Sequence, residues 1–228
     1  MAIADRQMWF DRLHTIMSFR TLLLAIFLVA SGMAQVQVGK QVGNPSVSGR
    51  GGSQKGTFRV IVEPASSSNS LEDLSRESPL IVEGTVDTSN FPTRQPDPGN
   101  PQRMETDVVF LVSKILKGDL SPQKTFPRVV ISQTGGTVGQ LTIETDEPRL
   151  AQGEHDILFL QPDARPNLKN IAGLPRYIVV GVWFGKFRVE RNNTITVPAR
   201  SPGGLRSHHQ EDHDAFLGKV MAAIAKSK

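Results

Sequence analysis

The chain has 228 residues, contains no cysteine and carries a formal net charge of +4 at pH 7. Without cysteine it has no disulfide, no cysteine nucleophile, no thiolate zinc site and no iron–sulfur cluster. Its lysines and arginines are scattered rather than gathered into one patch, so a nucleic-acid partner is not expected.

The first 34 residues have the pattern of a secretory signal peptide. Three arginines precede a short apolar run that starts at Leu22, and small residues follow as far as Ala34. The 13 residues from Leu22 to Ala34 fall short of the roughly 20 that a membrane-spanning helix needs. We therefore predict a signal peptide over 1–34 and a secreted or periplasmic protein. The alternative is a membrane anchor formed by an uncleaved leader, and translation can instead start at Met8 or Met17.

Residues 35–56 are rich in Gly, Ser, Gln and Val and hold too few large apolar side chains to pack. We predict a flexible tether over 35–56 and a single domain over 57–228. Within the domain, a strand is expected near Phe58, and Ser70 stands where it can cap a short helix over 71–77.

Two long strands follow in the sequence pattern. The first covers 80–88, where Gly84 suggests a bend or bulge. After a proline-rich surface loop over 91–102, the second covers 106–119. Its apolar alternation slips by one residue, which predicts a β-bulge near Ser113.

The remaining strands are short. Residues 129–144 have the pattern of a hairpin that turns at Gly135–Gly136. Residues 155–162 form a strongly apolar strand, and residues 176–190 supply two more, kinked at Gly181 and Gly185. A last strand is expected just after the turn at Asn192–Asn193.

The chain ends with apolar residues at helical spacing, from Phe216 to Ile224, and Ser207 is the expected cap of this C-terminal amphipathic helix. Many short strands with one or two peripheral helices predict a mainly β fold, a small antiparallel β-barrel.

Several motifs resemble a group of uncharacterised secreted bacterial proteins: "LIVEGTV", "VFLVSKILKG", "VVISQTGG", "DILFLQP" and "GKFRVE", in that order. The resemblance covers most of 71–190 and implies an oligonucleotide/oligosaccharide-binding-type (OB-like) barrel, similar to the netrin and metalloproteinase-inhibitor barrel. The inhibitors grip a metal with an N-terminal Cys, and this chain has no Cys, so that activity does not carry over. The group implies no function.

The densest polar cluster is "SHHQEDHDAF", which holds His208, His209 and His213. His209 and His213 are four residues apart and would share one helix face, as zinc or nickel ligands do. The favoured interpretation is a polar first turn whose carboxylates suit the helix dipole. No metal, cofactor or catalytic residue is assigned.

Two further patterns, one aromatic and one basic, each favour a structural interpretation. Trp183 and Phe184 are expected on opposite faces of one strand; core packing is favoured, and the alternative is an exposed ring that stacks on bases or sugars. The basic interval from Lys186 to Arg191 is interpreted as a solvated strand face.

The sequence thus favours an exported, non-enzymatic binding or interaction module whose partner is a protein or saccharide of the cell envelope. A membrane association is expected only if the leader is retained. The alternatives are a metal-dependent hydrolase that uses the terminal histidines and a binder of single-stranded nucleic acid or oligosaccharide.

Overall fold

The computed structural model describes residues 56–60, 68–88, 93–94, 104–120, 127–146, 148–164 and 173–227. The predicted signal peptide, nearly all of the predicted tether and most of the proline-rich loop lie outside these ranges. Among the helices of the described ranges, none combines the length and the apolar character that crossing a bilayer requires.

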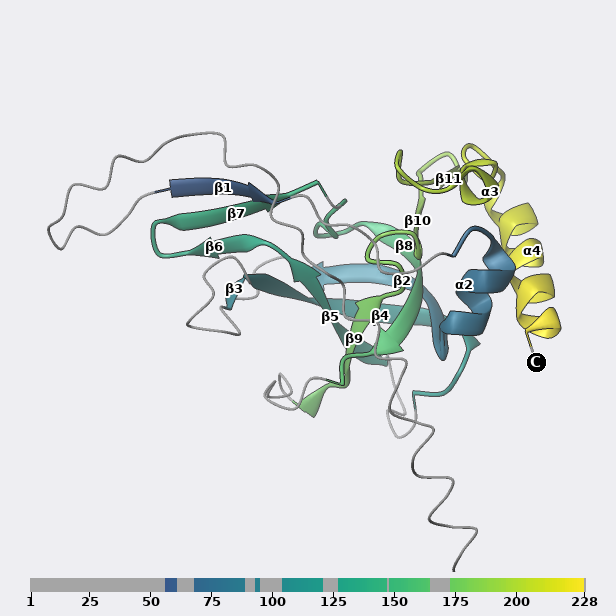
Figure 1. The fold of residues 1–228 in the computed structure, drawn as a ribbon. Coiled ribbons are helices and arrows are strands. Elements are labelled where there is room, and N and C mark those ends of the chain that lie inside the picture. The colour runs from purple at the N-terminus through teal and green to yellow at the C-terminus, as the bar shows by residue number, and fades with distance from the viewer. Residues whose placement is uncertain are drawn as a thin grey trace, which may run out of the picture. The chain divides into compact units, whose positions relative to one another are not determined.

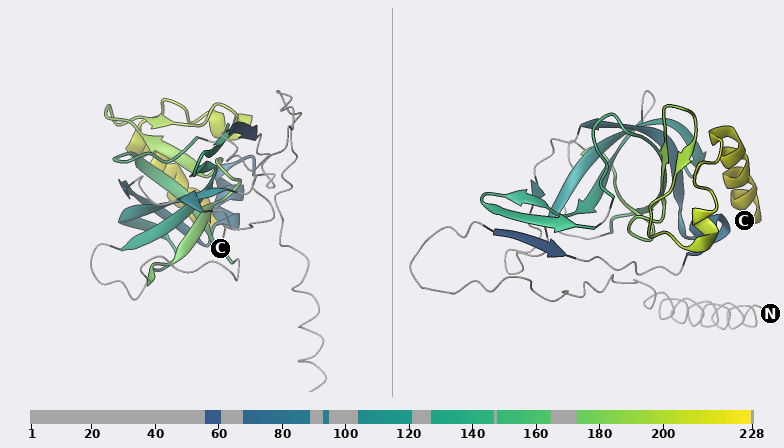
Figure 2. Two further views of the ribbon diagram at one scale, coloured as in Figure 1. Left: turned by 90° about the vertical axis from the view of Figure 1, so that its left-hand side faces the viewer. Right: turned by 90° about the horizontal axis from the view of Figure 1, so that it is seen from above.

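Five strands form a closed barrel, which is seen end-on in the right-hand view of Figure 2. They are β2 (Leu80–Thr88), β4 (Glu105–Lys117), β5 (Arg128–Thr134), β8 (His155–Pro162) and β9 (Arg176–Val179). The neighbours run β8, β2, β4, β5, β9, and β9 pairs back onto β8. The predictions of a mainly β chain and of a barrel are confirmed.

The barrel is not wholly antiparallel. Strands β5 and β9 run parallel, with Val130 opposite Arg176 and Ile131 opposite Tyr177. Strand directions can alternate all the way round a closed barrel only if the number of strands is even. A barrel of five strands must therefore contain a parallel pair, and the antiparallel prediction is wrong at this contact.

The remaining strands extend this framework (Figure 1). Strand β10 (Lys186–Val189) pairs with the beginning of β8, β11 (Ile195–Thr196) pairs with β10, and β3 (Thr93–Arg94) pairs with β4. A separate three-stranded sheet has the order β1 (Gly56–Val60), β7 (Leu141–Thr145), β6 (Gly136–Val138).

The predicted hairpin turn at Gly135–Gly136 is wrong. Gly135 has a φ of 90° and lies between β5 and β6, where the chain leaves the barrel for the separate sheet. Its N–H donates to the carbonyl of Met104 at 2.7 Å. The reversal comes later, at Gly139, whose φ is 61°. Strand β7 therefore pairs with β6 and β1 instead of returning along β5.

Alternation along the strands divides the apolar residues into two cores. The inner core fills the barrel and includes Val82, Val108, Phe110, Val129, Ile131, Leu158 and Leu160. The outer core includes Ile81, Ile157, Phe159, Phe187, Leu74, Phe216 and Val220. It joins the barrel wall to the helices α2 (Leu71–Glu77) and α4 (His213–Lys226), which pack side by side (Figure 1).

The bulge predicted near Ser113 is confirmed. On β2, Glu83 pairs with Lys114 while the next residue, Gly84, pairs with Val112, so Ser113 is the extra residue of β4. Its hydroxyl donates to the carbonyl of Glu83 at 3.0 Å. The bend expected at Gly84 therefore lies at this register shift.

Ser207 does not cap the C-terminal helix. It ends the short helix α3 (Gly203–Arg206), and α4 begins six residues later with Asp212 as its cap. The interruption comes at Gln210, which has a φ of 66° and donates its N–H to the carbonyl of Ile195 on β11. Pairing with β11 thus prevents one continuous helix.

Candidate functional site

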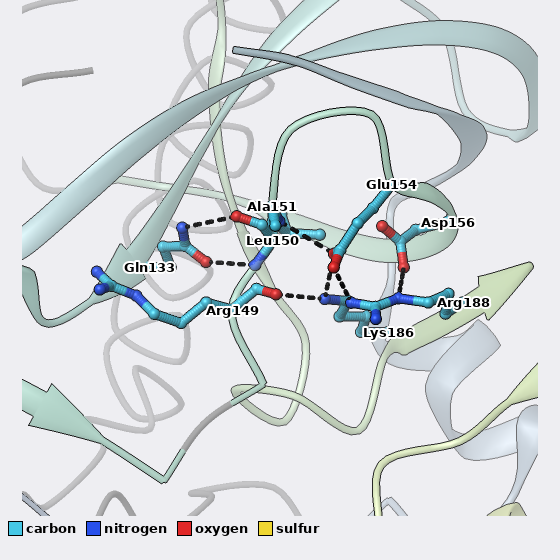
Figure 3. A network of polar contacts seen from close by, with 8 residues as sticks. All are labelled: Gln133, Arg149, Leu150, Ala151, Glu154, Asp156, Lys186 and Arg188. Atoms are coloured by element: carbon cyan, nitrogen blue, oxygen red, sulfur yellow. Dashed lines mark hydrogen bonds and ion pairs between the residues drawn. The ribbon is translucent and has the colours of Figure 1, made fainter. Parts of the chain in front are cut away.

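One end of the barrel is closed by the segment 148–154, which we call the plug. Leu150 belongs to the inner core and is buried, whereas Ala151, Gln152 and Gly153 are exposed. The Gln133 side chain from β5 holds Leu150 in place (Figure 3): its Oε1 accepts from the Leu150 N–H at 2.9 Å, and its Nε2 donates to the Leu150 carbonyl at 3.5 Å.

Charged side chains from the plug, β8 and β10 meet beneath it (Figure 3). Lys186 Nζ donates to the carbonyl of Arg149 at 2.8 Å and to Glu154 Oε2 at 3.2 Å. The guanidinium of Arg188 pairs with the other oxygen of Glu154. The side chain of Lys186 is only 4% exposed. The prediction of a solvated strand face over 186–191 is therefore wrong at Lys186.

Local strand geometry explains this meeting. Residues two apart on a strand point to the same face, so Lys186 and Arg188 share one face of β10. The register places Lys186 opposite Leu158 and Arg188 opposite Asp156. Leu158 points into the inner core. Both cations therefore lie on the inner side of the barrel wall, next to Asp156.

Asp156 is the unusual member of the network. Its side chain is fully buried, and among the described residues neither carboxylate oxygen has a hydrogen-bond partner. Arg188 Nε stands 3.9 Å away, which is an ion pair but too long for a hydrogen bond. Burial raises the pKa of Asp156 from 3.8 to about 6, against the opposing charge of Lys186.

A titratable group of this kind is a functional-site candidate on physical grounds. Its carboxyl can take up or release a proton at about pH 6, at a barrel end where Lys186, Arg188 and Glu154 also lie. The only sequence signal for this charged network is a spacing: two acidic residues stand two positions apart, and so do two basic residues. Glu154, Asp156, Lys186 and Arg188 are not assigned to a site by sequence reasoning, because that spacing also describes an exposed strand.

A second buried polar cluster lies on the outer side of the barrel wall. Arg176 Nη1 donates to Asp107 Oδ1 at 2.5 Å and to Ser132 Oγ at 2.9 Å, and Ser132 Oγ donates to Asp107 Oδ1 at 2.7 Å. The three residues come from β9, β4 and β5. The cluster thus links β5 and β9, the two strands of the parallel contact, to each other and to β4.

The terminal histidines are not arranged as expected. His213 is the first residue of α4, whereas His209 lies before the helix and accepts from the Val197 N–H through Nδ1 at 3.4 Å. His208 Nδ1 instead faces Glu211 Oε2 at 2.7 Å. The prediction that His209 and His213 share one helix face is wrong, because the helix begins only after Asp212.

His213 meets His155 instead. The Nε2 atoms of both rings lie 3.0 Å from the same oxygen, Oε1 of Glu83 on β2. This contact joins the start of α4 to β2 and β8. Across the described ranges, no three His, Asp or Glu side chains are placed so that they could hold a metal ion.

Trp183 and Phe184 do not lie on a strand. They belong to the turn 180–185, which bulges out between β9 and β10, and both are buried in the outer core at 3% and 6% exposure. Their rings meet edge to face at 5.7 Å. The favoured interpretation, core packing, is confirmed, and Trp183 offers no exposed face for stacking on bases or sugars.

No protein-family model and no curated protein matches this chain.

Proposed function

We propose that this chain is an exported binding module built on an OB-type barrel and that it does not catalyse a reaction. The observation that carries the proposal is the strand order. Counted along the chain, the barrel strands β2, β4, β5, β8 and β9 meet in the order 1-2-3-5-4 and close onto 1, with a parallel contact between 3 and 5. An OB barrel is also a five-stranded Greek-key barrel, so this strand order supports the proposed fold.

The strand order also indicates where a ligand would bind. OB barrels hold oligonucleotides or oligosaccharides on the face of their second and third strands, which here are β4 and β5. This step rests on analogy of fold. On β4 and β5, Ser113, Lys114 and Arg128 are exposed and Leu111 is half-buried. Ile115 of β4 is exposed as well, and such a mixture of apolar and polar groups suits a saccharide or an extended peptide of the cell envelope.

Export is supported by the sequence alone, through the short apolar run that ends at Ala34. Sequencing the N-terminus of the protein recovered from the periplasm or the medium tests it. We expect a mature chain that starts at Gln35. An intact leader on protein found in the cytosolic fraction would contradict export.

The binding role is tested with the purified chain and three sets of fluorescent probes: envelope oligosaccharides, envelope peptides and single-stranded oligonucleotides at low salt. We expect saturable binding of a saccharide or peptide, weakened by Arg128→Ser on β5. Arg191→Ser is the matched control, because Arg191 is equally an exposed arginine but lies in the turn after β10. Equal loss in both variants, or no binding in any set, would contradict the proposal.

A further inference from the structure

We propose that the plug, residues 148–154, opens and closes locally under the control of the charge on Asp156, and that it is open more often when this carboxyl is ionised. This conformational device goes beyond the binding role proposed above and does not depend on it.

The plug places one large apolar side chain, Leu150, in the inner core, and its other contacts with the barrel are polar. These are the Gln133 clamp, the bond from Lys186 to the Arg149 carbonyl, the bond from Arg149 to the Thr106 hydroxyl, the pairing of Glu154 with β10 and two backbone bonds to Val86 of β2. Segments with few buried apolar contacts are the ones that open at the least cost. Because the plug is one short stretch at the barrel end, it can open with the loss of its two backbone bonds to Val86 while the pairing of β2 with β8 from Leu80 to Thr85 stays intact.

Opening would expose the Asp156 carboxyl, because the plug's own Glu154 is part of the network that covers it. Four charged side chains of the described residues act on the Asp156 carboxyl through their charge: Glu154 of the plug, Lys186 and Arg188 of β10, and Glu190 just beyond β10. From β2, its register partner is Gly84, which brings no charge. The two cations favour the ionised carboxyl and the two carboxylates oppose it, so that burial decides the balance.

The direction follows from this balance. In the closed state the pKa of Asp156 is raised to about 6 by burial, whereas a hydrated carboxyl titrates near its ordinary value of 3.8. The open state therefore holds this proton less tightly than the closed state, and at any pH above 3.8 it is the more ionised of the two. Ionisation then favours opening, and a buried carboxylate without a hydrogen-bond donor regains water when the plug moves away.

Amide hydrogen exchange of the intact chain, followed by NMR, measures the opening directly. The reporters are the N–H groups of Leu150, Ala151 and Gly153, which bond to Gln133 Oε1, Glu154 Oε2 and the Val86 carbonyl. Each rate is divided by the rate of an unstructured peptide at the same pH. Between about pH 5 and pH 7.5, linkage predicts that the protection of these reporters falls roughly tenfold.

Three variants make the test specific. Asp156→Asn should keep the reporters equally protected at both pH values. Asp214→Asn is the matched control, because it removes a carboxylate that is 85% exposed and should leave the tenfold change intact. Gln133→Ala removes the clamp, so it should lower the protection of the reporters at both pH values and keep the pH dependence.

Two amides of the barrel wall separate local from global opening: Phe159, which donates to the Gly185 carbonyl, and Val180, which donates to the Phe159 carbonyl. Their protection should not follow the plug. If the reporters showed no pH dependence, or if Asp156→Asn kept it, the proposal would be overturned. An equal change at Phe159 and Val180 would also overturn it, since the whole barrel would then be opening.

Discussion

Gly84 offers the sharpest test of the barrel geometry. An added Cβ would stand 2.0 Å from the backbone oxygen of Leu111 and 2.8 Å from the ring of Phe110. A backbone oxygen of the neighbouring strand cannot rotate away, so β2 and β4 would have to move apart where the register shifts. Overpacking and the loss of one or two ladder hydrogen bonds together cost about 3 to 5 kcal/mol. We expect Gly84→Ala to lower the free energy of unfolding by that amount.

The same substitution at Gly218 is the matched control. Gly218 lies inside α4, and a Cβ there would meet nothing within 4 Å. Alanine is a better helix former than glycine by roughly 0.8 to 1 kcal/mol, so Gly218→Ala should raise the free energy of unfolding.

Urea unfolding of both variants, followed by the fluorescence of the buried Trp183 and by circular dichroism, measures the two changes. The change from glycine to alanine is expected to lower the free energy of unfolding at position 84 and to raise it at position 218. If Gly84→Ala lay within about 1 kcal/mol of the parent chain, the close contact between β2 and β4 would be refuted, since a clash of this size costs more.

Three further changes test other parts of the fold. In the folded chain the pKa of Asp156 is about 6, above its ordinary value of 3.8. The protonated carboxyl therefore makes its full contribution to the free energy of unfolding below about pH 4, and this contribution is lost as the pH rises through about 6. Asp156→Asn should therefore raise the free energy of unfolding at neutral pH by up to about 3 kcal/mol, measured by urea unfolding across this range. Asp212 caps α4 by accepting from the N–H groups of Asp214 and Ala215. Asp212→Ala should cost about 1 kcal/mol in urea unfolding and lower the helix signal in circular dichroism. Phe216 is fully buried against Phe187, with ring centroids 4.8 Å apart, and Phe216→Ala should cost about 3 to 5 kcal/mol in the same assay.

Features that depend on a few neighbouring residues could be predicted from the sequence. The apolar run over 155–162 defines β8, and a slip in alternation was enough to locate the bulge at Ser113. Features set by distant partners could not be predicted. The hairpin turn predicted at Gly135–Gly136 is wrong because this glycine pair redirects the chain into the sheet of β7 and β1. Nothing nearby in the sequence specifies those partners.

The charged network was hidden for a related reason. Lys186 and Arg188 alternate with apolar residues as they would on a solvated strand, and only the register with β8 reveals which face is covered. The contact between His213 and Glu83 could not be predicted either, because the two residues are 130 positions apart and meet only through the packing of α4. Sequence spacing therefore predicts strands well and the burial of their polar faces poorly.

Strand β8 connects the two cores, and this decides which part of the fold can move by itself. Its residues from Asp156 to Leu160 are all buried, because Leu158 and Leu160 face the barrel interior while Ile157 and Phe159 face the helices. Displacing β8 would expose both cores at once, so the barrel and the helical layer should unfold together. The plug precedes β8 and contributes one large apolar side chain, Leu150. Moving the plug therefore exposes the buried Asp156 carboxylate to water at a smaller cost in free energy than displacing β8.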